Sequence, residues 1–197
     1  MPKEILVQYL SEKEQDEVLR LRILMQSAPA IKGLKESCML MIPVEKVDRV
    51  LREMKATGME HRILHRGDRK YVVLFYWKER LATYIKRKDV RTLLAKYGYT
   101  DFTLEASLSL LCERVGYFYG EEQTFPHEIG AFLGYPVSDI EGFIKNSGKN
   151  FLLSKYWKVY SEFQKTRALF EQYDEAKNQA IRELMDGKNL AQIAGAA

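Results

Sequence analysis

The strongest structural signal in the sequence is MEHRILHRGDRKYVVLFYW, residues 59–77. Its second half is dense in β-branched and aromatic residues, which favour strands, and Gly67-Asp68 supplies a tight turn between two extended runs. The stretch therefore predicts a β-hairpin, with one strand over Met59–Arg66 and the other over Arg69–Trp77.

The residues before this hairpin predict one more strand and two helices. Cys38–Ile42 is a short apolar run that ends at a proline, as a buried strand does. From Val44 to Gly58 apolar side chains recur at helical spacing, and an earlier amphipathic stretch predicts a helix over Ser11–Gln26. Strand, helix, strand, strand predicts a small three-stranded mixed sheet with a helix on one face.

After the hairpin the apolar residues recur at helical spacing almost to the C-terminus. The sequence therefore predicts an α+β protein, in which the sheet and its covering helix occupy residues 1–77 and a mostly helical half occupies residues 78–197. A short extended piece near residues 150–160 is the one exception we expect. Because no repeat or linker separates the halves, we expect a single domain over residues 1–197.

The composition is that of an ordinary globular protein, with 46% hydrophobic and 29% charged residues. No stretch reaches the roughly 20 apolar residues of a membrane span, and the opening MPKEILVQYL lacks the features of a secretion signal. Cys38 and Cys112, each with two apolar residues on one side, are typical of small buried side chains in a reducing compartment. We expect a soluble cytoplasmic protein that does not act on membranes.

The net charge of +4 is unevenly distributed, because residues 62–96 carry eleven Lys and Arg against three Asp and Glu. A solvated surface is the ordinary interpretation of such a segment, and an acidic protein or nucleic-acid partner is the alternative. Nucleic-acid binding through charge alone would be weak and lost as salt rises. The basic side chains of this candidate patch are Arg62, Arg66, Arg69, Lys70, Arg87 and Lys88.

Residues 125–144, FPHEIGAFLGYPVSDIEGFI, are rich in Gly, Pro and aromatic side chains. Pro126 suits the first position of a helix, and Ser138 with Glu141 forms a capping-box pattern that predicts a second short helix. Two short helices joined by a tight turn are typical of a helix-turn-helix unit. Residues 115–144 contain five carboxylates and no Lys or Arg, however, so we expect no sequence-specific DNA binding.

His127 and Glu128, at the start of the first of these helices, with Asp139 and Glu141 nearby in the sequence, could form a general acid/base pair or a metal site. The alternative is a helix-capping histidine beside solvated carboxylates. His61 and His65 lie four residues apart on a predicted strand and are expected to face the same way, but two ligands are too few for a metal site. No metal site is predicted, and the sequence indicates no particular cofactor.

The run FPHEIGAFLGYPVSDIEGFIKNSGKN, with YWKVY at Tyr156–Tyr160, resembles the signature of a bacterial domain-of-unknown-function family found largely in anaerobic Gram-positive bacteria. The resemblance continues through SAPAIKGLK at Ser27–Lys35 and the closing LMDGKNLAQIAG, so it covers most of the chain. It implies membership of that family and no particular activity.

The aromatic residues of the YWKVY segment, interleaved with lysines, could stack on a flat ligand, although a hydrophobic core is the alternative. Our leading hypothesis is a small accessory protein that binds an unknown small molecule or protein through two segments of the family resemblance, residues 125–150 and 156–160. We call these the two signature segments. The rival hypotheses are an enzyme that uses His127 and Glu128, and a nucleic-acid module that uses residues 62–91. The candidate binding residues are Phe125, Pro126, His127, Tyr135, Tyr156, Trp157, Lys158 and Tyr160.

Overall fold

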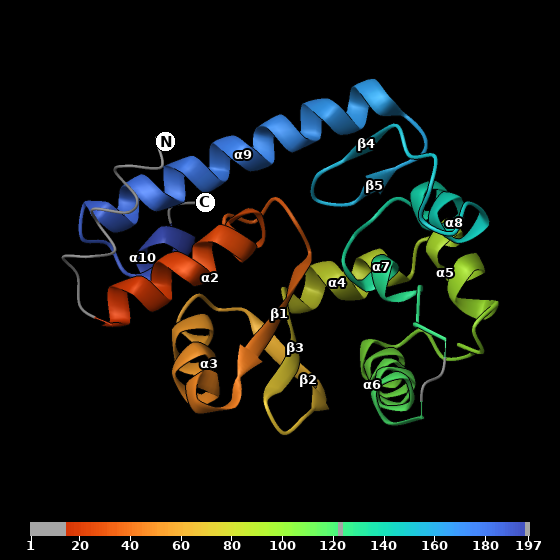
Figure 1. The fold of residues 1–197 in the computed structure, drawn as a ribbon, viewed down its shortest axis with the longest axis horizontal. Coiled ribbons are helices and arrows are strands. Elements are labelled where there is room, and N and C mark those ends of the chain that lie inside the picture. Colours follow the sequence, from red (N-terminus) through yellow and green to blue (C-terminus); the bar gives the residue numbers. More distant parts are fainter. Residues whose placement is uncertain (1–14, 122–123, 196–197) are drawn as a thin grey trace.

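The computed structural model describes residues 15–121 and 124–195, and it has a three-stranded sheet between two groups of helices (Figure 1). The predicted α+β class, with a mostly helical second half, is confirmed. The elements in chain order are α2 (Gln15–Ile31), β1 (Ser37–Pro43), the 3-10 turn η1 (Val44–Lys46), α3 (Val47–Lys55), β2 (Glu60–Arg66), β3 (Lys70–Tyr76), α4 (Lys78–Ile85), α5 (Lys88–Ala95), α6 (Leu104–Glu121), α7 (Ile129–Phe132), α8 (Val137–Lys145), β4 (Leu153–Ser154), β5 (Lys158–Val159), α9 (Phe163–Met185) and α10 (Leu190–Gly195).

The three predicted strands form one sheet in the order β1-β3-β2, and both pairings are antiparallel rather than mixed. The sheet is antiparallel and not mixed because β3 lies between β1 and β2. Helix α3 carries the chain from β1 to β2 so that these two strands run in the same direction without touching. The hairpin then brings β3 back between them, antiparallel to both neighbours.

The sheet buries both of its faces, because alternate side chains of β3 point in opposite directions. Val73 and Phe75 join a core with residues of α2, α3, α9 and α10. Leu74 and Tyr76 join a second core with residues of α4 to α8. The C-terminal helices therefore cover the same face of the sheet as α2 and α3, while the middle of the chain covers the other face.

Helix α9 crosses one side of the molecule, from α2 and α10 at one end to the small β4–β5 hairpin at the other (Figure 1). This hairpin is the extended piece predicted near residues 150–160. Its side chains Trp157 and Val159 pack on Phe170 and Tyr173 of α9 in a small core of their own. The N-terminal half of α9 thus holds the YWKVY segment, Tyr156–Tyr160, in place.

Helix α2 does not end at Gln26 as predicted but continues through Pro29 to Ile31. Proline in a helix normally removes a backbone hydrogen bond and ends or kinks the helix. Here the last turn buries Ala28 and Ile31 completely, and this apolar burial outweighs the lost bond. The predicted start at Ser11 lies outside the described residues.

His61 and His65 lie on opposite faces of the sheet, so the prediction that they face the same way is wrong. The pairing of β2 with β3 shifts by one residue between Ile63 and His65, which is the signature of a β-bulge. His61 lies near Phe75 on the α3 side, whereas His65 stacks on Tyr119 of α6 with ring centroids 4.4 Å apart.

The two cysteines are free thiols. Burial raises the pKa of the Cys38 thiol to about 12, which makes it a poor nucleophile. Burial also raises the pKa of Cys112, whose half-buried thiol lies 3.5 Å from the backbone oxygen of Ile63. Within residues 15–121 and 124–195, no helix combines the length and the apolar content needed to cross a bilayer.

Candidate functional site

A largely apolar pocket of about 350 Å³ opens where β1, the α7–α8 segment and the β4–β5 hairpin meet. This volume lies in the range of about 300–1,000 Å³ that is usual for small-molecule sites. Seven of the residues that line it were not among the predicted binding residues: Met39, Ile129, Gly130, Leu133, Asp139, Ile140 and Phe143. The structure does bring five of the eight predicted binding residues to this pocket: Phe125, His127, Tyr135, Trp157 and Lys158.

Phe125, His127 and Phe143 form one wall of the pocket. The ring centroid of His127 lies 5.4 Å from that of Phe125 and 5.3 Å from that of Phe143. The imidazole forms no hydrogen bond with any residue in the described part of the chain. It is held by aromatic contacts rather than as a helix cap, and its two nitrogens are available to a ligand.

Tyr135 and Trp157 form a second wall, with their rings stacked and the centroids 4.9 Å apart. The Trp157 ring meets Phe170 of α9 edge-on at 4.5 Å, and the Lys35 ammonium lies 5.2 Å from the centroid of Tyr135. Burial raises the pKa of the Tyr135 hydroxyl. Contacts from α9 and from the α2–β1 connection therefore fix this aromatic surface from behind.

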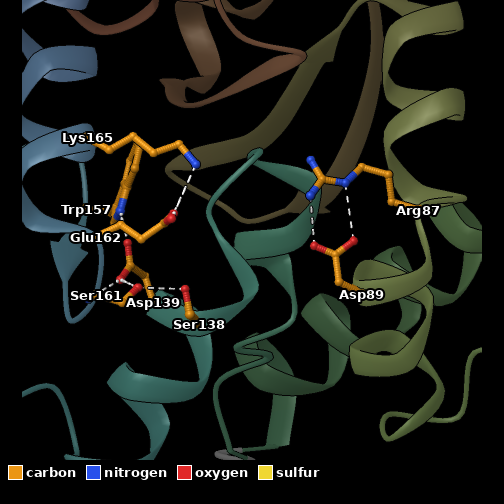
Figure 2. A network of polar contacts seen from close by, with 8 residues as sticks. All are labelled: Arg87, Asp89, Ser138, Asp139, Trp157, Ser161, Glu162 and Lys165. Carbon is orange, nitrogen blue, oxygen red and sulfur yellow. Dashed lines mark hydrogen bonds and ion pairs between the residues drawn. The ribbon is translucent and has the colours of Figure 1, made fainter.

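Asp139, in the first turn of α8, joins the two signature segments (Figure 2). Its carboxylate accepts hydrogen bonds from Trp157 Nε1 at 2.8 Å and from the backbone N–H groups of Tyr160 and Ser161 at 2.8 and 3.0 Å. The Ser161 hydroxyl lies 3.1 Å from the same carboxylate and 2.7 Å from the hydroxyl of Ser138. The expected solvated carboxylate is thus buried, which is possible because four donors compensate it.

Glu128 follows His127 in sequence but faces α6 rather than the pocket. Its fully buried carboxylate forms an ion pair with Arg114, whose guanidinium also lies over the ring of Tyr97. The pKa of the nearby Tyr99 hydroxyl is raised, mainly by burial and to a smaller extent by the negative charge of Glu128. The structure therefore does not bring the two predicted catalytic side chains to one surface.

The predicted capping box at the start of α8 is wrong. Helix α8 begins at Val137, and the hydroxyl of Ser138 contacts Ser161 instead of capping the helix. Glu141 forms an ion pair with Lys96 of α5 at 2.7 Å. The two short helices predicted from the sequence are present, but α8 is held against α5 and β5.

The other three candidate binding residues support the pocket without lining it. Pro126 is buried. Tyr156 packs against α9, and its hydroxyl donates to Asp174 at 3.1 Å. The side chain of Tyr160 lies directly against Gly142 of α8.

The predicted basic patch is divided between two regions. One part lies on the β2–β3 hairpin and the other at the start of α5, which are well apart in Figure 1. Arg62 pairs with Glu105 of α6, and Arg87 pairs with Asp89 at 2.8 Å. The members of the patch that are exposed and form no ion pair within the described ranges are Arg66, Arg69, Lys70 and Lys88.

Within the described ranges, no three His, Cys, Asp or Glu side chains gather in a way that could hold a metal ion.

Gly142→Ala is expected to lower the free energy of unfolding by about 1–3 kcal/mol, the usual cost of overpacking. A methyl group at Gly142 would lie 2.5 Å from Cβ of Tyr160, whose backbone is tied to Asp139. Gly116→Ala in α6 is the matched control, because nothing lies within 4 Å of its Cβ position. Alanine there should stabilise the helix by up to about 1 kcal/mol. Urea denaturation measures both changes, and equal stabilisation by both would contradict the close contact.

A family model described as "Protein of unknown function (DUF3793)" matches residues 23–194. The matched range includes every residue that lines the pocket and both signature segments. No curated protein and no solved structure matches the chain.

Proposed function

The chain belongs to the DUF3793 family of proteins of unknown function, and we propose that it binds a small ligand with a largely apolar body in the pocket between its two signature segments. The observation that carries the proposal is the convergence of Phe125, His127, Tyr135 and Trp157 on one cavity. Ligand sites typically combine such apolar and aromatic walls with a few polar groups.

Support for a binding role comes also from the rigidity of the walls. Protein interiors are close-packed, and an apolar cavity of this size tends to collapse unless its surroundings are fixed. Here the hydrogen bonds of Asp139 fix Trp157, and Phe170 holds the other side of the indole ring. A preformed pocket loses little entropy when a ligand enters, which favours binding.

The enzyme alternative has less support, because Glu128 is committed to Arg114 and does not line the pocket. His127 alone would have to exchange protons with the ligand. The nucleic-acid alternative has less support as well. Its basic side chains lie in two regions, the β2–β3 hairpin and the start of α5, rather than on one surface.

We also propose that the protein acts in the bacterial cytoplasm, as its resemblance to a bacterial family implies. Its two free thiols fit a reducing compartment. Residues 1–197 are proposed to fold as one domain, because the sheet contributes to the cores on both of its sides. We propose a small molecule as the binding partner of the protein, with another protein as the alternative.

N-phenyl-1-naphthylamine, an uncharged probe that fluoresces in apolar sites, is expected to bind the wild-type protein. Phe125→Ala should weaken this binding about tenfold, because it removes one aromatic ring from a wall of the pocket. Tyr117→Ala on α6 is the control, since Tyr117 is 45% exposed, Phe125 is 41% exposed, and only Phe125 lines the pocket. Fluorescence titration measures both affinities. Equal effects of the two variants, or no binding by the wild type, would refute the proposal.

A further inference from the structure

We infer that the ligand of this pocket is an amphipathic anion, with a flat apolar body and one anionic group that binds Lys158. The inference rests on the proposed function, because it assigns a chemical class to the ligand of the same pocket.

Lys158 places an ammonium group at the pocket without a carboxylate partner. Its Nζ donates to the backbone oxygen of Gly148 at 2.7 Å, and it lies 5.5 Å and 5.0 Å from the ring centroids of Phe143 and Phe151. No ion pair joins Lys158 to an acidic side chain in the described part of the chain. An ammonium has three N–H donors, so two remain for a ligand after the bond to Gly148.

The other charged residue that lines the pocket, Asp139, forms no ion pair with Lys158. The carboxylate of Asp139 is buried and accepts hydrogen bonds from Trp157, Tyr160 and Ser161. Its oxygens are therefore already used within the protein. A cationic ligand would be repelled by Lys158 with no carboxylate free to receive it. An anion would supply the charged acceptor that the Lys158 ammonium lacks.

The polar groups available to a ligand gather around Phe143. His127 and Lys158 both contact this ring, with the imidazole centroid 5.3 Å and the ammonium 5.5 Å from its centroid. The anionic group of a ligand is therefore placed at this side of the pocket. Its apolar body then faces the aliphatic lining of Leu133 and Ile140 and the stacked rings of Tyr135 and Trp157.

The test compares two probes that differ by one charged group. 8-Anilino-1-naphthalenesulfonate carries a sulfonate on the same ring system as the uncharged N-phenyl-1-naphthylamine. Titrations at about 0.15 M salt suppress loose binding to surface charges. The wild type is expected to bind the anionic probe about tenfold more tightly than the neutral one, as a hydrogen-bonded charge contact provides.

Lys158→Met keeps the apolar stem and removes the charge, so it should abolish this preference, which is measured as the ratio of the two affinities. Lys158→Arg should retain the preference. Lys145→Met, at the exposed end of α8, is the control and should change neither affinity. Melting temperatures of all variants check that each is folded.

The outcomes separate this inference from the proposed function. Equal affinity of the wild type for both probes, or a preference that survives Lys158→Met, would overturn the inference and leave the pocket as a binding site. Failure of the wild type to bind the neutral probe would overturn the proposed function and this inference with it.

Discussion

Asp139→Ala is expected to lower the free energy of unfolding by about 4 kcal/mol and to abolish binding of N-phenyl-1-naphthylamine. The substitution leaves the indole N–H of Trp157 and the backbone N–H groups of Tyr160 and Ser161 without their acceptor. Each buried donor left unpaired costs about 1–3 kcal/mol. Because the Trp157 ring then loses the bond that orients it, the wall that it shares with Tyr135 is lost too. Urea denaturation and probe titration measure the two effects.

Asp89→Ala is the matched control for this substitution. Asp89 is exposed and forms an ion pair with Arg87 at the start of α5, which Figure 2 also shows. An exposed pair of this kind contributes at most about 1 kcal/mol. Asp139→Asn should fall between the two, because an amide keeps one acceptor oxygen and loses the other. A loss in Asp139→Ala no larger than in Asp89→Ala would show that the network does not hold the pocket.

Lys32→Met is expected to lower the free energy of unfolding by about 3 kcal/mol. The ammonium of Lys32, the residue after α2, donates to both carboxylate oxygens of Glu183 in α9, at 3.0 and 3.1 Å, and to the backbone oxygen of Ile193 in α10 at 3.1 Å. The two side chains are only 6% and 11% exposed. Breaking a buried pair by removing one partner costs about 3–5 kcal/mol. The lower end applies, because Gln179 and Lys188 still contact the carboxylate.

Two further variants test the cause of this loss by urea denaturation. Arg167→Met removes an exposed pair with Glu171 on the same helix and should cost about 0.5 kcal/mol or less. Glu183→Leu added to Lys32→Met should recover much of the stability, because no buried charge is then left unpaired. If Lys32→Met costs no more than Arg167→Met, the pair does not join the three helices.

The same ion pair predicts an acid-sensitive part of the stability. Burial acts to raise the pKa of Glu183, but hydrogen bonds from Lys32 and Gln179 outweigh it and hold this pKa below its usual value. The carboxyl regains its usual pKa of about 4.3 when the chain unfolds. Its contribution to stability is therefore complete above that pH and is lost as the pH falls through the lower pKa of the folded state. Glu183→Gln should flatten this part of the pH profile of the unfolding free energy.

The sequence was sufficient for most of the fold because the strands and helices follow local patterns. The hairpin over residues 59–77 needed only strand-forming residues around Gly67 and Asp68. Its place in the sheet depended on long-range packing, so the antiparallel insertion of β3 was not predictable from the same pattern. The continuation of α2 through Pro29 likewise depends on burial by distant helices.

The candidate site was predictable at the level of segments but not of individual roles. Aromatic residues marked both halves of the pocket, yet the roles of Glu128 and Asp139 depended on partners brought near by the fold. Arg114 lies 14 residues before Glu128, and Trp157 lies 18 residues after Asp139. A carboxylate in the first turn of a short helix, inside a long signature motif, was the signal that could have singled out Asp139.

A crystal structure of the protein with N-phenyl-1-naphthylamine tests the central claim most directly. The account predicts that the probe lies in the pocket, with its rings in contact with Phe125, Tyr135 and Trp157. An empty pocket at saturating probe concentration, or a probe bound only at another surface, would contradict it.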